Sequence, residues 1–314
     1  MNVIKHKFKK FSKIVDELCK LGEIPKYFRY VQKKTFDNYQ HLFLLIAKEN
    51  TTFGYRKYTE SLYDSKIPQY IGLKKIPHFT TIQKYASRLK SKILEKLIFL
   101  CKHLFKEQGT IWGVDSTGIE LDHASAHYCK RIDREKPVKG FLNFNVISDL
   151  YNKSFVVVKI RKRRRHDCVD LQCMYPKIKN EHFDFFVADK GYDSEKNHKM
   201  IFESGKESLI SMKHMNLPIH KTGGRYRKLA KRNFEFGIYG QRNITESNFS
   251  AFKRKYGSKI KARKFKTQKV ELLFKILSYN IERILYTLYE ILKLYLGFLQ
   301  SLTINLIYIL SLKV

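Results

Sequence analysis

The hydrophobic pattern of the chain changes near Gly109, and this change constrains the fold more than any other feature. Runs rich in β-branched and aromatic residues predict strands at 110–121, 141–150, 154–160, 183–188 and 209–212. The spacer Tyr151-Asn-Lys-Ser predicts a hairpin turn, and helical patterns at 168–180 and 194–204 alternate with the later strands. Strands that pair by hairpins, followed by strands that alternate with helices, indicate an α/β fold with a mixed sheet and flanking helices.

The residues before this region have a helical pattern. The segment 39–62 carries apolar residues at helical spacing, and a basic helix follows with Thr80 or Thr81 as its expected N-cap. Short helices before a basic helix fit a helix-turn-helix DNA reader, although a plain helical bundle explains the same pattern. We therefore predict a small all-α domain at 1–105, for DNA binding or oligomerisation, before the α/β domain at 106–290.

The charge of the chain points to a polyanionic partner. It has 62 Lys and Arg against 29 Asp and Glu, a formal net charge of +33. The many like charges repel one another in a compact chain unless a polyanion neutralises them, so a nucleic acid is the expected partner. The cations alternate with Tyr, Phe and apolar runs, which favours a folded basic protein over a disordered tail. A basic structural protein of the ribosomal type is the simpler alternative.

Five consecutive cations follow the third predicted strand, and they repel one another unless an anion lies across them. The arginines of this run, for which we predict phosphate contacts, are Arg161, Arg163, Arg164 and Arg165.

The five cysteines are odd in number and form no Cys-x-x-Cys pair, so a reducing, cytoplasmic compartment is expected. The first ten residues are charged where a signal peptide needs an apolar core, so secretion is not expected. His123, His127 and Cys129 have the spacing of half a zinc site, but a solvated loop explains them equally simply.

The C-terminal segment 291–314 has almost no charge. Residues 294–312 contain no charged side chain and have roughly the length of a membrane span. They also contain Gln300 and Asn305 and continue a helical pattern that runs from Val270. We expect an apolar helical tail that packs in a bundle or dimer, with a membrane anchor as the alternative.

Three acidic residues stand out by their surroundings. Asp115 and Asp189 each end a strongly apolar run and are expected at the end of a buried strand, where a charge costs several kcal/mol unless a partner offsets it. Glu246 is expected on a helical face that it shares with four other residues, namely Tyr239, Arg242, Phe249 and Lys253. Carboxylates from three separate elements suggest a metal site, and hard oxygen ligands suit Mg²⁺, with Mn²⁺ as a substitute. The alternative is that each acid caps a helix or turn.

Two neighbours of these acids have alternative interpretations. Asp193 is a substitute ligand, but its position before a predicted helix favours an N-cap. His166 and Asp167 follow the arginine run and could act as a general base, although metal-bound water needs none.

The chain resembles the DDE-type transposases of bacterial and archaeal insertion sequences. The resemblance lies in Val114-Asp-Ser-Thr-Gly118, in Ala188-Asp-Lys-Gly-Tyr-Asp-Ser194, and above all in a Tyr, Arg, Glu, Lys signature with gaps of two, three and six. That signature is formed by Tyr239, Arg242, Glu246 and Lys253. It implies an RNase H-like core in which two Mg²⁺ ions are held by the catalytic acids Asp115, Asp189 and Glu246. The other signature residues are then expected to contact DNA phosphates.

The family resemblance also implies the reaction and the partners. It implies a prokaryotic, nucleoid-associated enzyme that nicks transposon-end DNA and joins the freed 3′ end to target DNA, acting as a homodimer or higher multimer on duplex DNA. One alternative is an RNase H-like nuclease that cuts without joining. Another is a catalytically inactive repressor that only binds DNA. A membrane-associated role rests on the tail alone.

Overall fold

The structure is a computed structural model that describes residues 7–28, 35–121, 140–163 and 165–311, with the backbone alone from 294 onward. The possible zinc half-site, with His123, His127 and Cys129, lies outside the described residues, as does Arg164.

The N-terminal third is helical, as predicted. Its elements are α1 (Lys7–Leu21), α2 (Asn38–Glu49), α3 (Tyr55–Ser61), α4 (Ile67–Tyr70), α5 (Phe79–Arg88), α6 (Ser91–Leu100) and the 3-10 turn η1 (Cys101–Leu104). The prediction that Thr80 or Thr81 caps the basic helix is wrong, because α5 begins at Phe79 and His78 occupies the N-cap position. The Thr80 hydroxyl instead lies 2.8 Å from Nδ1 of His78.

A mixed six-stranded sheet forms the centre of the molecule. Its strands are β1 (Ile111–Leu121), β2 (Gly140–Asp149), β3 (Ser154–Arg161), β4 (Phe185–Ala188), β5 (Glu207–Ile210) and β6 (Lys259–Ile260). The order is β3-β2-β1-β4-β5, with β6 beside the far end of β1. The first three strands are antiparallel, while β4 and β5 run parallel to β1. This is the RNase H-like α/β sheet that was expected.

Helices flank the sheet, at bounds close to the predicted ones. They are α8 (Asp167–Met174), the 3-10 turns η2 (Tyr175–Lys177) and η3 (Lys190–Tyr192), and α9 (Glu195–Phe202). A buried cluster that includes Trp112, Leu171, Phe186 and Ile201 packs α8 and α9 against the sheet. The fifth strand begins two residues earlier than the pattern suggested, at Glu207.

The basic segment 214–236, which follows β5, is partly helical. It contains η4 (Ile219–Lys221) and α10 (Arg225–Arg232). The Glu195 carboxylate accepts hydrogen bonds from the backbone N–H groups of Tyr226 at 2.8 Å and Arg227 at 3.1 Å. An acid at this position satisfies the free N–H groups of the first helical turn, and this long-range cap is invisible to local sequence patterns.

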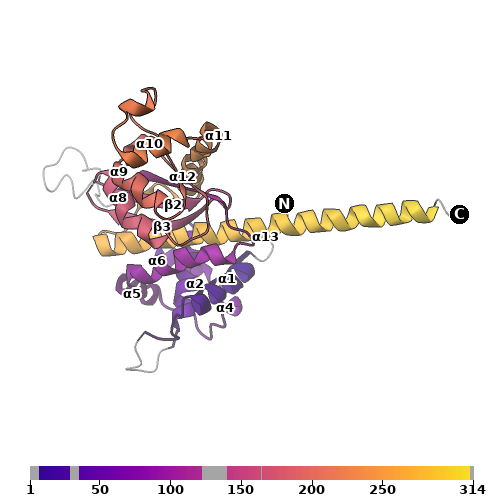
Figure 1. Ribbon diagram of the computed structural model, residues 1–314. Helices are drawn as coiled ribbons and strands as arrows, with labels where there is room; N and C mark the ends of the chain where they lie inside the picture. The colour runs from indigo at the N-terminus through magenta and orange to yellow at the C-terminus, as the bar shows by residue number, and fades with distance from the viewer. Residues whose placement is uncertain (1–6, 29–34, 122–139, 164, 312–314) are drawn as a thin grey trace.

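The longest element, α13 (Phe265–Ser311), passes between the sheet and the N-terminal helices and then extends well beyond the body of the protein (Figure 1). The side chain of Asn280 on α13 bonds both backbone groups of Phe155 on β3, at 3.0 and 2.6 Å. One continuous hydrophobic cluster joins α1, α2, α6, β2, β3 and α13. In the described residues, no helix combines the length and apolarity needed to span a bilayer. The division at residue 105 stays a prediction.

Candidate active site

Asp115 lies in the middle of β1, and this corrects the expectation that it ends a strand. The parallel ladder between β1 and β4 has Val114 opposite Ala188 as its last pair. Strand β4 stops there while β1 continues, so Asp115 and Asp189 both directly follow that pair. The end of β4 thus places Asp189 next to Asp115 on the neighbouring strand.

Asp189 caps the turn η3. Its Oδ1 accepts a hydrogen bond from the backbone N–H of Lys190 at 2.7 Å. The same turn is anchored by Tyr192, whose hydroxyl donates to Asn145 Oδ1 on β2 at 3.0 Å. The amide of Asn197 donates to the Tyr192 carbonyl at 2.7 Å. The backbone around Asp189 is therefore held from two sides.

Asp193 does not cap α9, contrary to the prediction. The N-cap is Ser194, whose hydroxyl accepts from the backbone N–H of Asn197 at 3.1 Å. The Asp193 carboxylate instead accepts from Arg227 Nε at 2.8 Å and lies 3.3 Å from His198 Nε2. It is engaged in joining η3, α9 and α10.

Glu246 lies in the first turn of α12 (Asn243–Tyr256), which packs on the sheet. Phe249 contacts Phe144 and Phe155 edge-on or tilted, with ring centroids 5.4 and 5.8 Å apart. Gly113 on β1 permits this approach, since a Cβ there would meet Thr245 Oγ1 at 3.3 Å. Thr245, the residue before Glu246, thus packs against β1, while the Glu246 side chain is exposed.

The predicted single helix through the signature is interrupted. Tyr239 ends the short helix α11 (Phe236–Tyr239) and Arg242 ends the 3-10 turn η5 (Gly240–Arg242). The predicted neighbours still meet, because Arg242 Nη1 donates to Glu246 Oε1 at 2.8 Å. Phe249, by contrast, is buried in the core and does not share the exposed face of Glu246.

The three acids share one electrostatic environment. The pKa of Asp115 is raised to about 6, first because burial disfavours the carboxylate and then because Glu246 and Asp189 add negative charge. The backbone N–H of Ser116 and the Arg242 guanidinium oppose this rise. The pKa of Arg242 is raised although burial would lower it, because Glu246 is paired with it and Asp189 is near. Arg242 is therefore paired with Glu246 and acts electrostatically on Asp115 and Asp189 as well.

The donor chemistry suits a hard divalent cation, since Asp189 and Glu246 lie near enough to Asp115 to add to the rise in its pKa that burial mainly causes. As the side chains stand, however, the described residues hold no ready-made group of three or more His, Cys, Asp or Glu ligands. Glu246 is engaged by Arg242 instead. A metal would thus compete with the guanidinium for Glu246.

Lys253 reaches β1 near Asp115. Its Nζ donates to the hydroxyl of Thr117 at 2.6 Å. Tyr239 packs on Phe234, with centroids 5.1 Å apart, and belongs to the small cluster beneath β4 and β5. Lys253 thus contacts β1 two residues after Asp115, whereas Tyr239 packs in the segment before α12.

The arginines of the basic run differ in their surroundings. Arg161 forms an ion pair with the buried Asp170, which also accepts from Asn145 Nδ2 at 2.8 Å. Arg161 is therefore committed to joining β3 and α8, whereas Arg163 and Arg165 are exposed. His166 is exposed at the start of α8.

Three supporting residues escaped the sequence interpretation. Asn145 is a buried polar residue between the apolar residues Phe144 and Val146, and Gly113 is a glycine within a strand; each is a signal for a special contact. Tyr192 offered no such signal, because a tyrosine after a turn is usually packing alone.

An RNase H-like sheet with three acids around one strand junction is typical of enzymes that act on nucleic-acid phosphodiesters. The family model described as Transposase DDE domain matches residues 108–281, more than half of the chain, and the protein belongs to this family. The match covers all three acids.

A solved structure described as "Cryo-EM structure of piggyBac transposase synaptic complex with hairpin DNA" is similar over 89% of this chain and 74% of its own, with 11% identity and a TM-score of 0.44. The RNase H-like fold is defined by the strand order and directions of the sheet. Among curated proteins, no relative matches this chain.

Proposed function

We propose that the protein is an active transposase that cleaves transposon-end DNA in a metal-dependent reaction and joins the freed 3′ end to target DNA. The observation that supports the proposal is that Asp189 at the end of β4 and Glu246 on α12 both raise the pKa of Asp115 on β1, in a chain of the Transposase DDE domain family. Duplex DNA is the proposed partner because the net charge of +33 favours binding to a polyanion.

The three acids are proposed to hold two Mg²⁺ ions, or Mn²⁺ in their place, which supply Lewis-acid charge to the phosphodiester and activate water. Arg242 is the group that must rearrange, since it now neutralises Glu246. An arriving phosphate offers the guanidinium a new bidentate partner and frees the glutamate. Lys253, beside Thr117 on β1, supplies a second cation for the phosphate chain.

The same proposal assigns DNA contacts to Tyr239, Arg163 and Arg165. It also places the enzyme at the nucleoid of a prokaryotic cell and expects a dimer or higher multimer on DNA. Arg161 is a weaker candidate for phosphate contact, because Asp170 already neutralises it.

The test is nicking of labelled duplex that carries the element's terminal sequence, with Mg²⁺ or with chelator. Asp115→Asn, Asp189→Asn and Glu246→Gln should each abolish nicking while duplex binding persists. Asp184→Asn, an exposed acid at the other end of β4, is the matched control and should nick normally. Unchanged nicking by Glu246→Gln would make the assignment wrong.

Joining is tested separately, by capture of the labelled 3′ end into a plasmid. Nicking without capture would identify a nuclease that cuts but does not join. Binding that is equal with Mg²⁺ and chelator, together with no nicking, would identify a repressor.

A further inference from the structure

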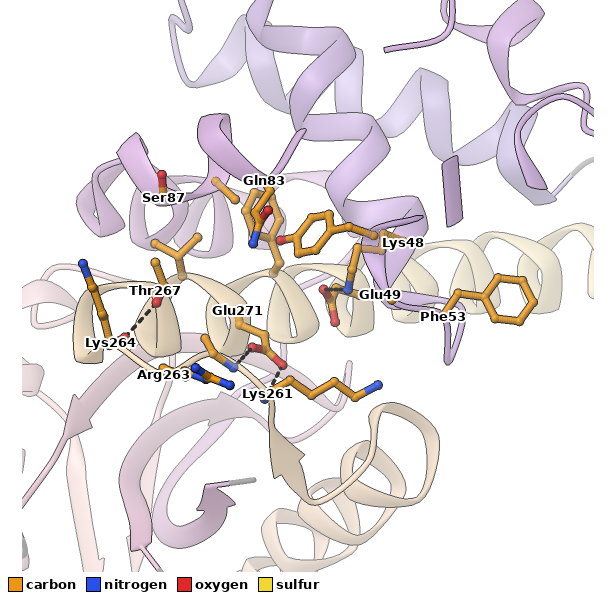
Figure 2. Close-up of a pocket in the computed structure, with 16 residues that line it drawn as sticks. Lys48, Glu49, Phe53, Gln83, Ser87, Lys261, Arg263, Lys264, Thr267 and Glu271 are labelled. Atoms are coloured by element: carbon orange, nitrogen blue, oxygen red, sulfur yellow. Dashed lines mark hydrogen bonds and ion pairs between the residues drawn. The ribbon is translucent and has the colours of Figure 1, made fainter. Parts of the chain in front are cut away.

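A cavity of about 410 Å³ lies away from the acids, between the N-terminal helices and the start of α13 (Figure 2). Its residues come from the end of α2, from the segment before α3, from α5 and from the segment 261–274. Figure 2 shows Gln83 and Ser87 of α5 on one wall, with Lys261, Arg263 and Lys264 on the other. Distant parts of the chain thus build it together.

The segment 261–264, which we name the basic strap, has a fixed backbone. The Glu271 carboxylate accepts from the backbone N–H groups of Lys261 at 3.1 Å and Ala262 at 2.9 Å. The buried Gln268 side chain donates to the carbonyls of Ala262 and Arg263, both at 3.1 Å. Because both anchoring side chains belong to the first turns of α13, the strap is held in one conformation before any ligand binds.

The strap presents cations without acidic partners. Lys261, Arg263 and Lys264 are exposed, and within the described part of the chain no carboxylate forms an ion pair with any of them. The acids that line the cavity are already engaged. Glu49 is paired with Lys48, and Glu271 with the strap backbone. The outward charge of this wall is therefore positive and uncompensated.

The opposite wall, formed by α5, has polar side chains at the cavity. Helix α5 exposes Gln83, Lys84 and Arg88, and Ser87 is half-buried beside them. The Gln83 amide and the Ser87 hydroxyl line the cavity opposite the cationic strap, and hydrogen-bond donors beside fixed cations suit a chain of phosphates.

The strap is also linked to the candidate active site through the sheet. It follows β6 directly, and β6 pairs with β1 at Glu120 and Leu121. Strand β1 rises about 3.3 Å per residue, so Asp115 lies about 20 Å back along it from Leu121. That length equals about six base-pair steps of duplex DNA.

We propose that the groove between α5 and the basic strap binds the phosphate backbone of duplex DNA, and that one duplex reaches from this groove to the acids. The inference rests on the proposed function for the identity of the polyanion. It adds a second, non-catalytic DNA contact, built jointly by the N-terminal helices and α13.

The test is duplex binding, measured by fluorescence anisotropy of a labelled DNA duplex in chelator, so that no cleavage occurs. The full-length variant Lys261→Gln/Arg263→Gln/Lys264→Gln is compared with Lys9→Gln/Lys10→Gln/Lys13→Gln on α1, which removes the same charge from exposed positions at another part of the helical layer. In a plot of the logarithm of the affinity against the logarithm of the salt concentration, each lost phosphate contact reduces the magnitude of the slope by about 0.9. The strap variant should therefore reduce it by about 2 to 3, and the α1 variant by less than about 1.

Equal effects of the two variants, or no effect of the strap variant, would overturn the inference. Lys261→Arg/Lys264→Arg keeps the charge and should bind normally, which separates loss of phosphate contact from damage to the fold. The outcomes are independent of the proposed function: metal-dependent nicking with an ineffective strap variant rejects the groove alone. If all three acid variants still nick the duplex, the proposed active site is rejected, while binding that depends on the strap remains valid.

Discussion

Tyr192 donates a hydrogen bond from its hydroxyl to Asn145 Oδ1 at 3.0 Å, and this contact ties the turn that carries Asp189 to strand β2. Both residues are almost completely buried. Burial raises the pKa of Tyr192 well above its usual value, so the hydroxyl remains a proton donor at neutral pH. Asn145 in turn donates to Asp170, the partner of Arg161. A buried polar chain thus runs from the arginine on β3 to the turn beside the acids.

Tyr192→Phe should weaken this anchor without removing the ring. It leaves the buried Asn145 oxygen without its donor, so we expect the free energy of unfolding to fall by about 1 to 3 kcal/mol. We also expect a higher Mg²⁺ concentration for half-maximal nicking, because Asp189 becomes less well placed. Chemical denaturation and a Mg²⁺ titration measure the two effects.

Tyr226→Phe is the control for this prediction, because its hydroxyl donates to Glu203 at the surface, at 3.1 Å. We expect a change within about 0.5 kcal/mol there. Equal effects of the two substitutions would contradict a special role for Tyr192.

Gly113→Ala tests the packing of α12 against β1. The added Cβ would lie 2.9 Å from Val187 Cγ2 and 3.3 Å from Thr245 Oγ1, so α12 or β4 must move. We expect a loss of about 1 to 3 kcal/mol in stability. A displacement of about 1 Å at Glu246 should slow nicking about a hundredfold.

Gly118→Ala, in the same strand, is the matched control. Its Cβ would meet only Phe141 Cδ1, at the ordinary contact distance of 3.7 Å. Stability and nicking should stay close to those of the parent. If both alanine variants behaved alike, the close approach at Gly113 would not position Glu246.

Asp193 predicts a pH dependence of stability. Burial would raise its pKa, but hydrogen bonds from His198 and Arg227 outweigh burial and lower it below the usual 3.8; the Cys168 thiol also faces the turn, donating to the Asp193 carbonyl. A depressed carboxyl pKa stabilises the fold above the unfolded-state value, and this contribution is lost as the pH falls through the folded-state pKa.

Asp193→Asn should therefore be less stable than the parent above about pH 4, and the gap should narrow as the pH falls below that. Unfolding curves at a series of pH values measure this gap. Asp184→Asn, which replaces an exposed acid, should show no comparable narrowing. If the difference in stability between the parent and Asp193→Asn increased as the pH fell, a lowered Asp193 pKa could not be its cause.

Arg242→Gln tests the competition for Glu246. Removing the guanidinium frees the glutamate and removes a positive charge from Asp115 and Asp189. An exposed i,i+4 ion pair is worth about 0.3 to 0.5 kcal/mol, so Mn²⁺ should bind at least about twofold more tightly in the absence of DNA. Calorimetric titration with Mn²⁺ measures this, and Arg232→Gln on α10 is the control. Weaker Mn²⁺ binding by Arg242→Gln would show that the arginine does not compete with metal.

The alternation of strand and helix patterns was sufficient to predict the sheet, because period-two and period-3.6 hydrophobicity are local properties. The acids were identifiable because each charge follows an apolar run or lies within a spaced signature. Predictions from local sequence patterns were wrong where the interacting residues are distant in the sequence. They placed Asp115 at a strand end, although β1 extends to Leu121 and only β4 stops there.

Tertiary structure alone decided how each cation is used. Arg161 and Arg163 are neighbours in one basic run, yet only Arg161 meets a buried acid, since α8 carries Asp170 back over β3. Lys261 and Arg263 are ordinary surface cations in the sequence, and they form a rigid strap only because α13 supplies Glu271 and Gln268 beneath them. The sequence determines which residues can carry a charge or be buried. The tertiary structure determines which charges form ion pairs, because the energy of an ion pair depends on the distance between segments that are far apart in the sequence.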